Sequence, residues 1–194
     1  MNPLKSVLGT IISGFVLAIA IMLAVGQGAF NAPALSVWFH VIFGVIWIGL
    51  LYYFNFVQVP GVGQALADKE PGPAAINKYI APRALLWFRW AALGTWITGM
   101  GLLGPNVKAA FMLQDGFVVI GIGAWFGTIM LLNVWGLIWR NQKKILGLDG
   151  KTHSPEVIAK AKTVALMASR INTLLSIPML MCMVAYGHGN VLPF

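Results

Sequence analysis

The sequence predicts an all-α polytopic membrane protein, a bundle of about five transmembrane helices. Three observations lead to this fold class: five apolar stretches of bilayer-crossing length, a composition of 59% hydrophobic and 9% charged residues, and short connections between the stretches. A helix of about 20 apolar residues crosses the roughly 30 Å hydrocarbon core, and helices satisfy their own backbone hydrogen bonds there. We therefore expect a single integral-membrane domain over residues 1–194, with spans at Leu8–Val25, Val37–Val57, Ala84–Leu103, Gly116–Trp139 and Thr163–Tyr186.

The first span is expected to remain attached as a signal anchor, because its apolar core is longer than that of a typical cleaved signal peptide. A tight turn at Gly26–Pro33 joins it to the second span. The connection Val59–Pro82 is rich in Gly and Pro, which predicts an irregular loop with one short helical piece.

The later connections are a short loop at Gly104–Asp115 and a basic loop at Arg140–His153. The residues Ser154–Glu156 that follow are typical of a helix start: a capping serine, a proline at the first helical position and an acid in the first turn. We therefore expect the last helix to begin near Pro155 and to enter the membrane near Thr163.

Basic residues are distributed unevenly between the two predicted membrane faces. Of the 13 Lys and Arg residues, ten precede the first span or lie in the second and fourth connections, one lies between spans three and four, and two lie inside spans. Cytoplasmic loops carry the excess of Lys and Arg. We therefore expect a cytoplasmic N-terminus and an external C-terminus. The net charge of +8 then reflects membrane orientation and is no sign of nucleic-acid binding.

Small and aromatic residues indicate where helices meet each other and the membrane surface. Gly123 and Gly127 form a GxxxG pair in the fourth span, a spacing that lets two helices approach closely. Such a pair also occurs often by chance. The two alternatives are therefore that it marks a contact between helices or that it has no structural role. Most of the eight Trp residues lie near span ends, where they are expected to anchor the helices at the interface.

Two histidines are the candidate metal ligands. His40 lies about one turn inside the external end of span two, and His188 lies just beyond the external end of span five. The predicted topology brings both to the same membrane face, where two imidazoles can serve as axial ligands of a b-type haem. Gly44 and Trp47 share the helical face of His40, and Gly44 would leave room for a flat porphyrin. The alternative is that His40 only hydrogen-bonds across helices and that His188 only meets water.

Arginines and asparagines lie in the cytoplasmic halves of the spans. Arg89 and Arg170 are the candidates for contact with lipid phosphates or with a partner subunit, either by snorkelling or by binding an anionic ligand. Asn55, Asn133 and Asn172 are expected to hydrogen-bond with these arginines and to hold the bundle together.

Several function classes have no support in the sequence. No predicted span carries an acidic residue, which argues against an ion-coupled transporter or a proton pump. Motifs of zinc hydrolysis, nucleotide binding, nucleophile elbows and redox dithiols do not occur. The single cysteine, Cys182, excludes a disulfide framework within the chain.

Four segments resemble a known family. They are WFHVIFGVIWIGLLYYFNFVQVP (Trp38–Pro60), Tyr79–Leu103, the GTIM-containing Gly121–Leu146, and Ala161–Gly189. Together they are similar to the N-terminal membrane domain of the bacterial cytochrome-c-linked urate hydroxylases. The resemblance implies a bacterial inner (cytoplasmic) membrane location, and His40 and His188 match family histidines.

The chain also departs from that family. It has no CxxCH motif of a cytochrome c domain, so a cytochrome partner would be a separate protein. Family histidines are missing from three regions, Ala84–Trp87, Gly121–Trp125 and Ser169–Asn172. These losses argue against urate hydroxylation and leave the scaffold with one external haem site.

Three functional hypotheses follow. The first is an integral-membrane electron-transfer subunit that binds haem b and works with a c-type cytochrome or a larger redox complex. The second is a non-catalytic accessory subunit of a respiratory or photosynthetic complex, in contact with other membrane subunits. The third is a membrane oxidase similar to urate hydroxylase.

Overall fold

The computed structural model describes residues 2–26 and 32–189, and its described part is helical without β-strands. This confirms the predicted all-α class. Contacts divide the chain into two compact units, residues 1–35 and 36–194. The predicted turn Gly26–Pro33 falls mostly on residues 27–31, outside the described part. The expectation of a single domain stays a prediction.

The first unit contains a 3-10 turn, η1 (Pro3–Lys5), and the apolar helix α1 (Val7–Val25). Ser6 caps α1, because its Oγ accepts a hydrogen bond from the backbone N–H of Gly9 at 3.0 Å. The helix contains no charged residue. Its length and composition agree with the first predicted span.

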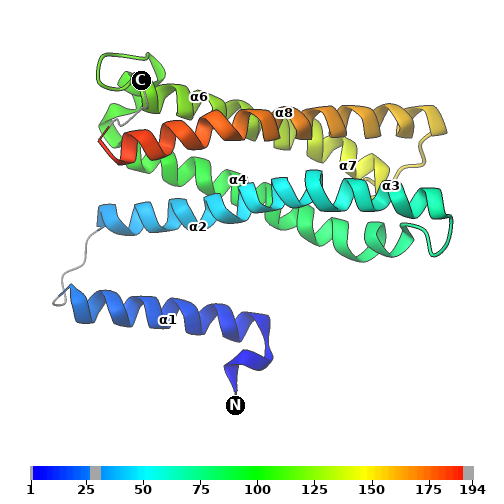
Figure 1. The fold of residues 1–194 in the computed structure, drawn as a ribbon, viewed down its shortest axis with the longest axis horizontal. Helices are drawn as coiled ribbons and strands as arrows, with labels where there is room; N and C mark the ends of the chain where they lie inside the picture. The colour runs from blue at the N-terminus through cyan, green and yellow to red at the C-terminus, as the bar shows by residue number, and fades with distance from the viewer. Residues whose placement is uncertain (1, 27–31, 190–194) are drawn as a thin grey trace. The chain divides into compact units, whose positions relative to one another are not determined.

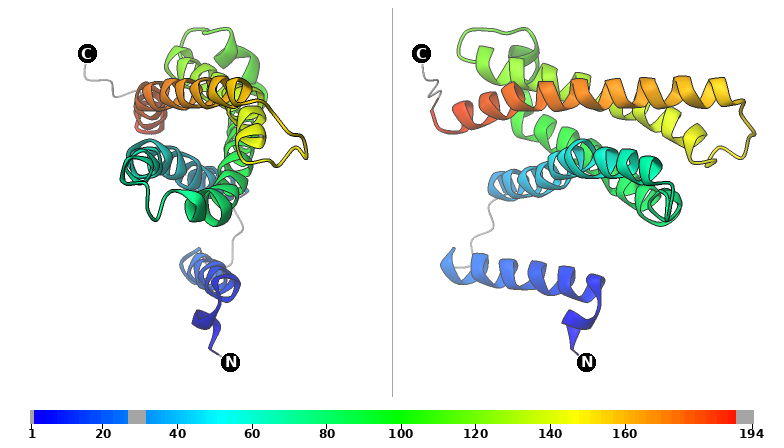
Figure 2. Two further views of the ribbon diagram at one scale, coloured as in Figure 1. Left: turned by 90° about the vertical axis from the view of Figure 1, so that its right-hand side faces the viewer. Right: turned by 45° about the vertical axis from the view of Figure 1, so that its right-hand side comes forward.

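The second unit is built from four long helical segments that alternate in direction (Figure 1). Figure 2 shows the same arrangement from two other sides. The segments are α2 (Ala32–Tyr53) continued by η2 (Phe54–Gln58) and α3 (Val59–Asp68); η3 (Ile76–Ile80) with α4 (Ala81–Leu103); α6 (Val118–Asn133) continued by η5 (Val134–Ile138) and α7 (Trp139–Ile145); and α8 (Pro155–Gly187). Two short elements, η4 (Gly104–Asn106) and α5 (Val107–Phe111), connect α4 with α6.

The second helix corrects part of the expectation for the connection Val59–Pro82. The expected short helical piece is α3, but it continues the second helix directly and is not separated from it by an irregular segment. It continues through Pro60 as far as Asp68. A proline removes one backbone donor and clashes with the carbonyl four residues earlier. The π-helical turn η2, which ends at Gln58, relieves this problem by moving to i→i+5 bonding. An example is the bond from the N–H of Val59 to the carbonyl of Phe54.

The start of the last helix is confirmed. α8 begins at Pro155, and the Oγ of Ser154 accepts a hydrogen bond from the N–H of Val157 at 3.5 Å. The helix continues without interruption through Pro178 to Gly187. It is therefore long enough to reach from the fourth connection to the opposite end of the unit.

Four helices among the described residues are long and apolar enough to cross a membrane: Val7–Val25, Ala32–Asp68, Val118–Ile145 and Pro155–Gly187. The chain is therefore a multi-pass membrane protein. Helix α4 matches the third predicted span in position but is not among the four. Two Arg, three Trp and two Thr residues lower its hydropathy, so its passage through the bilayer stays a prediction.

Large apolar side chains from α2, α4, α6 and η5 form the core of the second unit: Trp47, Leu51, Phe88, Met130 and Val134. Helix α8 packs closely against α6 through small residues. A Cβ added to Gly123 would lie 3.0 Å from the Cβ of Cys182, and one on Gly127 would lie 3.6 Å from the Sδ of Met179. The predicted GxxxG contact is thus confirmed, with α8 as the facing helix.

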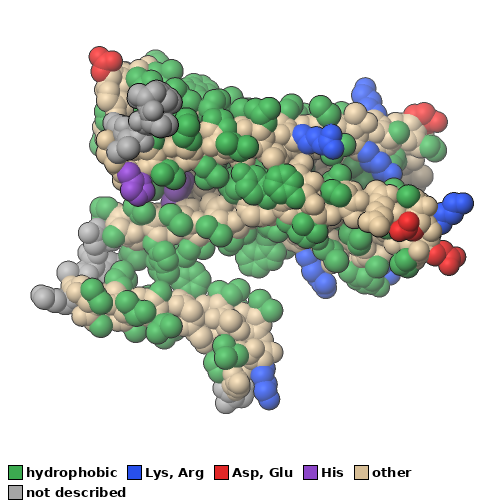
Figure 3. All heavy atoms as spheres, viewed as in Figure 1, with side chains coloured by type: hydrophobic (Ala, Val, Ile, Leu, Met, Phe, Trp, Pro, Cys, Tyr) green, Lys and Arg blue, Asp and Glu red, His purple; other side chains and the backbone are tan. Residues whose placement is uncertain are grey.

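The two ends of the second unit differ in charge. The connections 69–75 and 146–154 lie at one end, and the connection 104–117 lies at the other, with the start of α2 and the end of α8 (Figure 1). In the larger unit most of the visible Lys and Arg side chains gather towards the first of these ends, while hydrophobic side chains cover the helices between the ends (Figure 3).

Candidate functional site

His40 lies on α2 and its ring is fixed by α4. Its Nδ1 lies 2.9 Å from the carbonyl oxygen of Thr95 and 3.2 Å from the Oγ1 of Thr98. A carbonyl oxygen only accepts, so Nδ1 carries the proton and donates it. The Thr98 hydroxyl donates its own proton to the carbonyl of Gly94 at 2.7 Å. Its oxygen can therefore also accept a hydrogen bond from His40. The lone pair of the neutral ring is therefore on Nε2, as in histidines that bind metals.

A glycine on α4 leaves space for this ring. A Cβ added to Gly99 would lie 3.0 Å from the Cε1 of His40. Thr95, Thr98 and Gly99 were not predicted as partners of His40. Their spacing of three and four residues on one helix face was the available signal, but the register between α2 and α4 was needed to recognise it.

Gly44 and Trp47, the two other residues predicted on this face of α2, lie on the same side of the helix as His40. A Cβ on Gly44 would lie 3.9 Å from the Cγ2 of Thr95, so Gly44 faces α4. Trp47 is 1% exposed, and its buried indole Nε1 has no hydrogen-bond partner among the described residues. Gly44 therefore lies beside a side chain of α4 and not beside open space.

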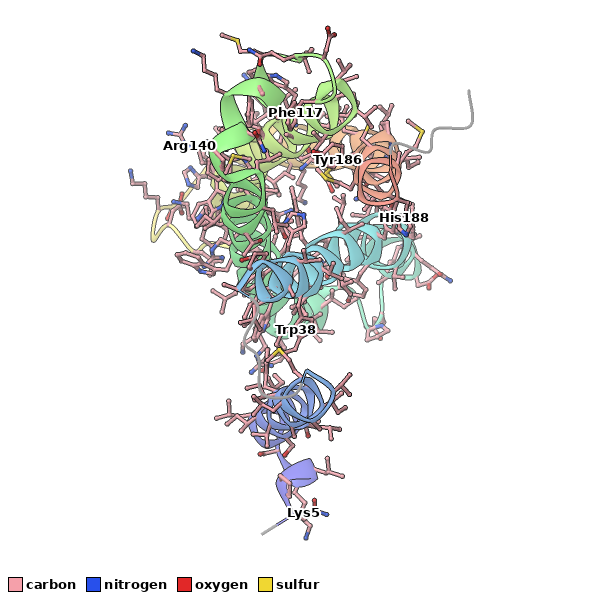
Figure 4. The ribbon with its side chains drawn as sticks, turned by 90° about the vertical axis from the view of Figure 1, so that its left-hand side faces the viewer. Lys5, Trp38, Phe117, Arg140, Tyr186 and His188 are labelled. Atoms are coloured by element: carbon pink, nitrogen blue, oxygen red, sulfur yellow. The ribbon has the colours of Figure 1, made fainter. Side chains whose placement is uncertain are left out.

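His188 lies at the C-terminal end of α8, at the same end of the unit as the start of α2 (Figures 1 and 4). Its Nδ1 donates to the carbonyl of Val184 at 2.8 Å, and its side chain is exposed. As in His40, the neutral form of this ring has its lone pair on Nε2. In the described part of the chain no hydrogen bond joins the two histidines.

The described residues contain no metal site of several protein ligands. No three His, Cys, Asp or Glu side chains gather in a metal-binding arrangement within residues 2–26 and 32–189. A haem needs only one or two axial ligands, because the porphyrin supplies the other four. The two histidines are therefore the candidate ligands on these segments.

The two arginines that were predicted to lie inside spans have different surroundings. The guanidinium carbon of Arg89 lies 3.8 Å from the ring centroid of Trp139, and its Nη1 donates to the carbonyl of Leu85 at 3.5 Å. This is a cation–π contact between α4 and α7. Arg170 is exposed on α8. Contact of either residue with lipid or with a partner stays a prediction.

The asparagines cross-link the helices without the arginines. Asn133 donates to the Oδ1 of Asn172 at 3.0 Å, and Asn172 donates to the carbonyl of Met130 at 3.0 Å. Asn55 donates to the Oγ of Ser169 at 2.8 Å. Among the described residues, none of these asparagines bonds to Arg89 or Arg170, because the polar side chains of α8 are closer partners.

No protein-family model, curated protein or solved structure matches this chain. The fold and the side-chain geometry therefore carry the functional argument.

Proposed function

We propose that the chain is an electron-transfer subunit of a bacterial inner membrane. In this proposal the Nε2 atoms of His40 and His188 hold a haem b near the external face. Electrons pass from there to a c-type cytochrome or to a larger redox complex.

The observation that carries the proposal is the hydrogen bonding of both imidazoles. His40 and His188 each donate Nδ1–H to a backbone carbonyl, at 2.9 and 2.8 Å. This leaves Nε2 of each ring as the atom that carries the lone pair in the neutral form, which is the form that binds iron. A polar side chain on a membrane-spanning helix is costly and usually has a functional reason. The carbonyl of Thr95 and the hydroxyl of Thr98 explain the orientation of the His40 ring, because both contact Nδ1. They do not account for Nε2, the atom that would bind iron.

Each part of the proposed site has a defined task. The bound haem would supply the one-electron chemistry. His40 would hold the iron from a position fixed by α4, and His188 would do so from the end of α8. Trp47 and the apolar core beneath would keep water from that side of the site. An external site suits exchange of electrons with a separate cytochrome.

A second candidate is a non-catalytic accessory subunit of a respiratory or photosynthetic complex. The observation in its favour is that the Cγ2 of Thr95 lies beside Gly44, where a porphyrin was expected to fit. In this case the ring of His40 serves only to join α2 to α4. The oxidase activity implied by the sequence resemblance stays a prediction, tested by urate-dependent oxygen uptake.

The test is a reduced-minus-oxidised absorption spectrum of the detergent-purified chain, recorded alone and with its native partners. We expect a b-type α-band, with about one haem for each chain by extraction. The band should disappear in His40→Ala and in His188→Ala.

His153→Ala is the matched control, because His153 lies in the connection at the opposite end of the unit and should leave the band unchanged. Circular dichroism of each variant separates loss of haem from loss of fold. If the wild-type protein gives no band in either preparation, the haem proposal is wrong and the accessory subunit is the remaining candidate.

A further inference from the structure

A basic pocket lies at the end of the second unit that is opposite His188. It has a volume of about 450 Å³ and is lined by Arg140, Lys143, Lys144, Asp149 and Lys151, with Asn141 beside them. Pockets that hold small ligands have volumes of roughly 300–1,000 Å³. The size of this pocket therefore fits a small ligand.

The pocket results from the local fold of the chain. Lys143 and Lys144 follow Arg140 by three and four residues on α7, so both lie on the helix face of Arg140. The connection then turns back at Gly147 and Gly150, which have φ of +66° and +68°, a conformation that favours glycine. These turns bring Asp149 and Lys151 to the same pocket.

The charges in the pocket do not cancel. Four cationic side chains and one carboxylate line it, which leaves a net charge of +3. The carboxylate of Asp149 is already paired, because its Oδ2 lies 2.7 Å from the Nε2 of His153. In the described part of the chain, no carboxylate forms an ion pair with Arg140, Lys143, Lys144 or Lys151.

We propose that this pocket binds a phosphate group. An arginine guanidinium presents a planar fork of donors to phosphate oxygens, and lysine ammonium groups add point charges around them. Arg140 with Lys143, Lys144 and Lys151 supplies this set, and Asn141 lies beside it. The phosphate belongs either to the headgroup of an anionic phospholipid or to a soluble phosphorylated compound.

The position of the pocket places it at the level of lipid headgroups. It lies at the end of the membrane-crossing segment Val118–Ile145, next to Trp139, whose ring lies 5.8 Å from the Nζ of Lys143. Tryptophan is enriched at the membrane–water interface, and basic pockets at helix ends bind anionic headgroups. Figure 4 shows Arg140 projecting outward from the bundle, where a ligand can reach it.

Binding is measured on the full chain purified in an uncharged detergent. One arm of the experiment titrates short-chain phosphatidylglycerol, and the other titrates glycerol phosphate, which has the same phosphate chemistry without acyl chains. The test variant is the pair Arg140→Gln with Lys143→Gln. The matched control is Lys160→Gln with Lys162→Gln. It also removes two positive charges, but from exposed positions on α8 outside the pocket.

We expect at least one of the two probes to bind the wild-type and the control variant equally, and to bind the test variant at least tenfold more weakly. Asp149→Asn should bind several-fold more tightly, because it removes the one negative charge of the pocket. Binding of the lipid alone identifies a headgroup as the source of the phosphate, and binding of glycerol phosphate identifies a soluble compound. The proposal is overturned if neither probe binds the wild-type protein, or if the test and control variants lose affinity equally.

Discussion

His40 shows how one polar side chain is accommodated inside a membrane bundle. Its Nδ1–H donates to the carbonyl of Thr95, and the ring fits beside Gly99, where a larger residue would collide. The period of the helix predicted that His40, Gly44 and Trp47 share a face. The partner residues on α4 were not predicted, because sequence spacing on one helix contains no information about its register against another.

The buried amide of Asn172 is expected to stabilise the bundle. It is 0% exposed and joins α8 to α6 through Asn133 and the carbonyl of Met130. Asn172→Ala should destabilise the protein by about 1 kcal/mol, because interhelical hydrogen bonds in membranes contribute modestly. Thermal unfolding in detergent measures this change.

Asn141→Ala is the control for that experiment, since within the described residues its exposed amide bonds only to the carbonyl of Leu137 in its own helix. An equal loss of stability in both variants would show that the buried contact between α6 and α8 has no special importance.

At the level of elements, the close approach of α6 and α8 depends on Gly123. A methyl group there would lie 3.0 Å from the Cβ of Cys182, an atom fixed to the backbone of α8. Gly123→Ala should therefore be less stable than Gly136→Ala by about 1–3 kcal/mol, the usual cost of overpacking. Gly136 has open space around it in the same continuous helix, so the two substitutions share the same gain in helix propensity.

Equilibrium unfolding of both glycine variants measures that difference. If Gly123→Ala is as stable as Gly136→Ala, the two helices are not held at the distance seen in the structure.

The connection between α7 and α8 should respond to acid. The hydrogen bond from His153 is the largest cause that lowers the pKa of the Asp149 carboxyl, and the N–H of Lys151 also contributes. A lowered folded-state pKa means that this contribution to stability is present above the ordinary carboxyl pKa of about 3.9 and is lost as the pH falls through the lower value. A carboxyl carbon NMR titration should show this low pKa.

In His153→Ala the same titration should move the pKa of Asp149 back towards its ordinary value. An unchanged titration curve would mean that the contact between His153 and Asp149 does not persist in solution.

The helix boundaries show which local signals can be used in a membrane protein. The capping sequence at Ser154 and Pro155 predicted the start of α8 correctly, because a cap acts on its own neighbours. The rule that Gly and Pro end a helix failed at Pro60. There a preceding π-helical turn lets the helix continue although proline has no backbone N–H to donate. A similar π-helical turn, Ile76–Ile80, precedes Pro82 at the start of α4.

The fold class of the whole molecule followed from hydropathy, because a bilayer constrains each crossing segment independently. Helix α4 was found at its expected place although its Arg, Trp and Thr residues make it less apolar than the others. The basic pocket was not predicted. It depends on the turns at Gly147 and Gly150, which return the connection towards α7.

For the whole molecule, we predict that the histidine-bearing end and the basic end lie on opposite sides of one membrane. The haem proposal depends on this orientation, because it places the haem outside. The same orientation would put the basic pocket on the cytoplasmic side. The most direct measurement is cysteine labelling of intact cells with a membrane-impermeant maleimide. Cys182→Ala provides the background, and Asp115→Cys or Lys151→Cys is added at an exposed position in each connection. We predict that Asp115→Cys is labelled in intact cells and that Lys151→Cys is labelled only after the membrane is opened. Labelling of Lys151→Cys in intact cells would contradict the account.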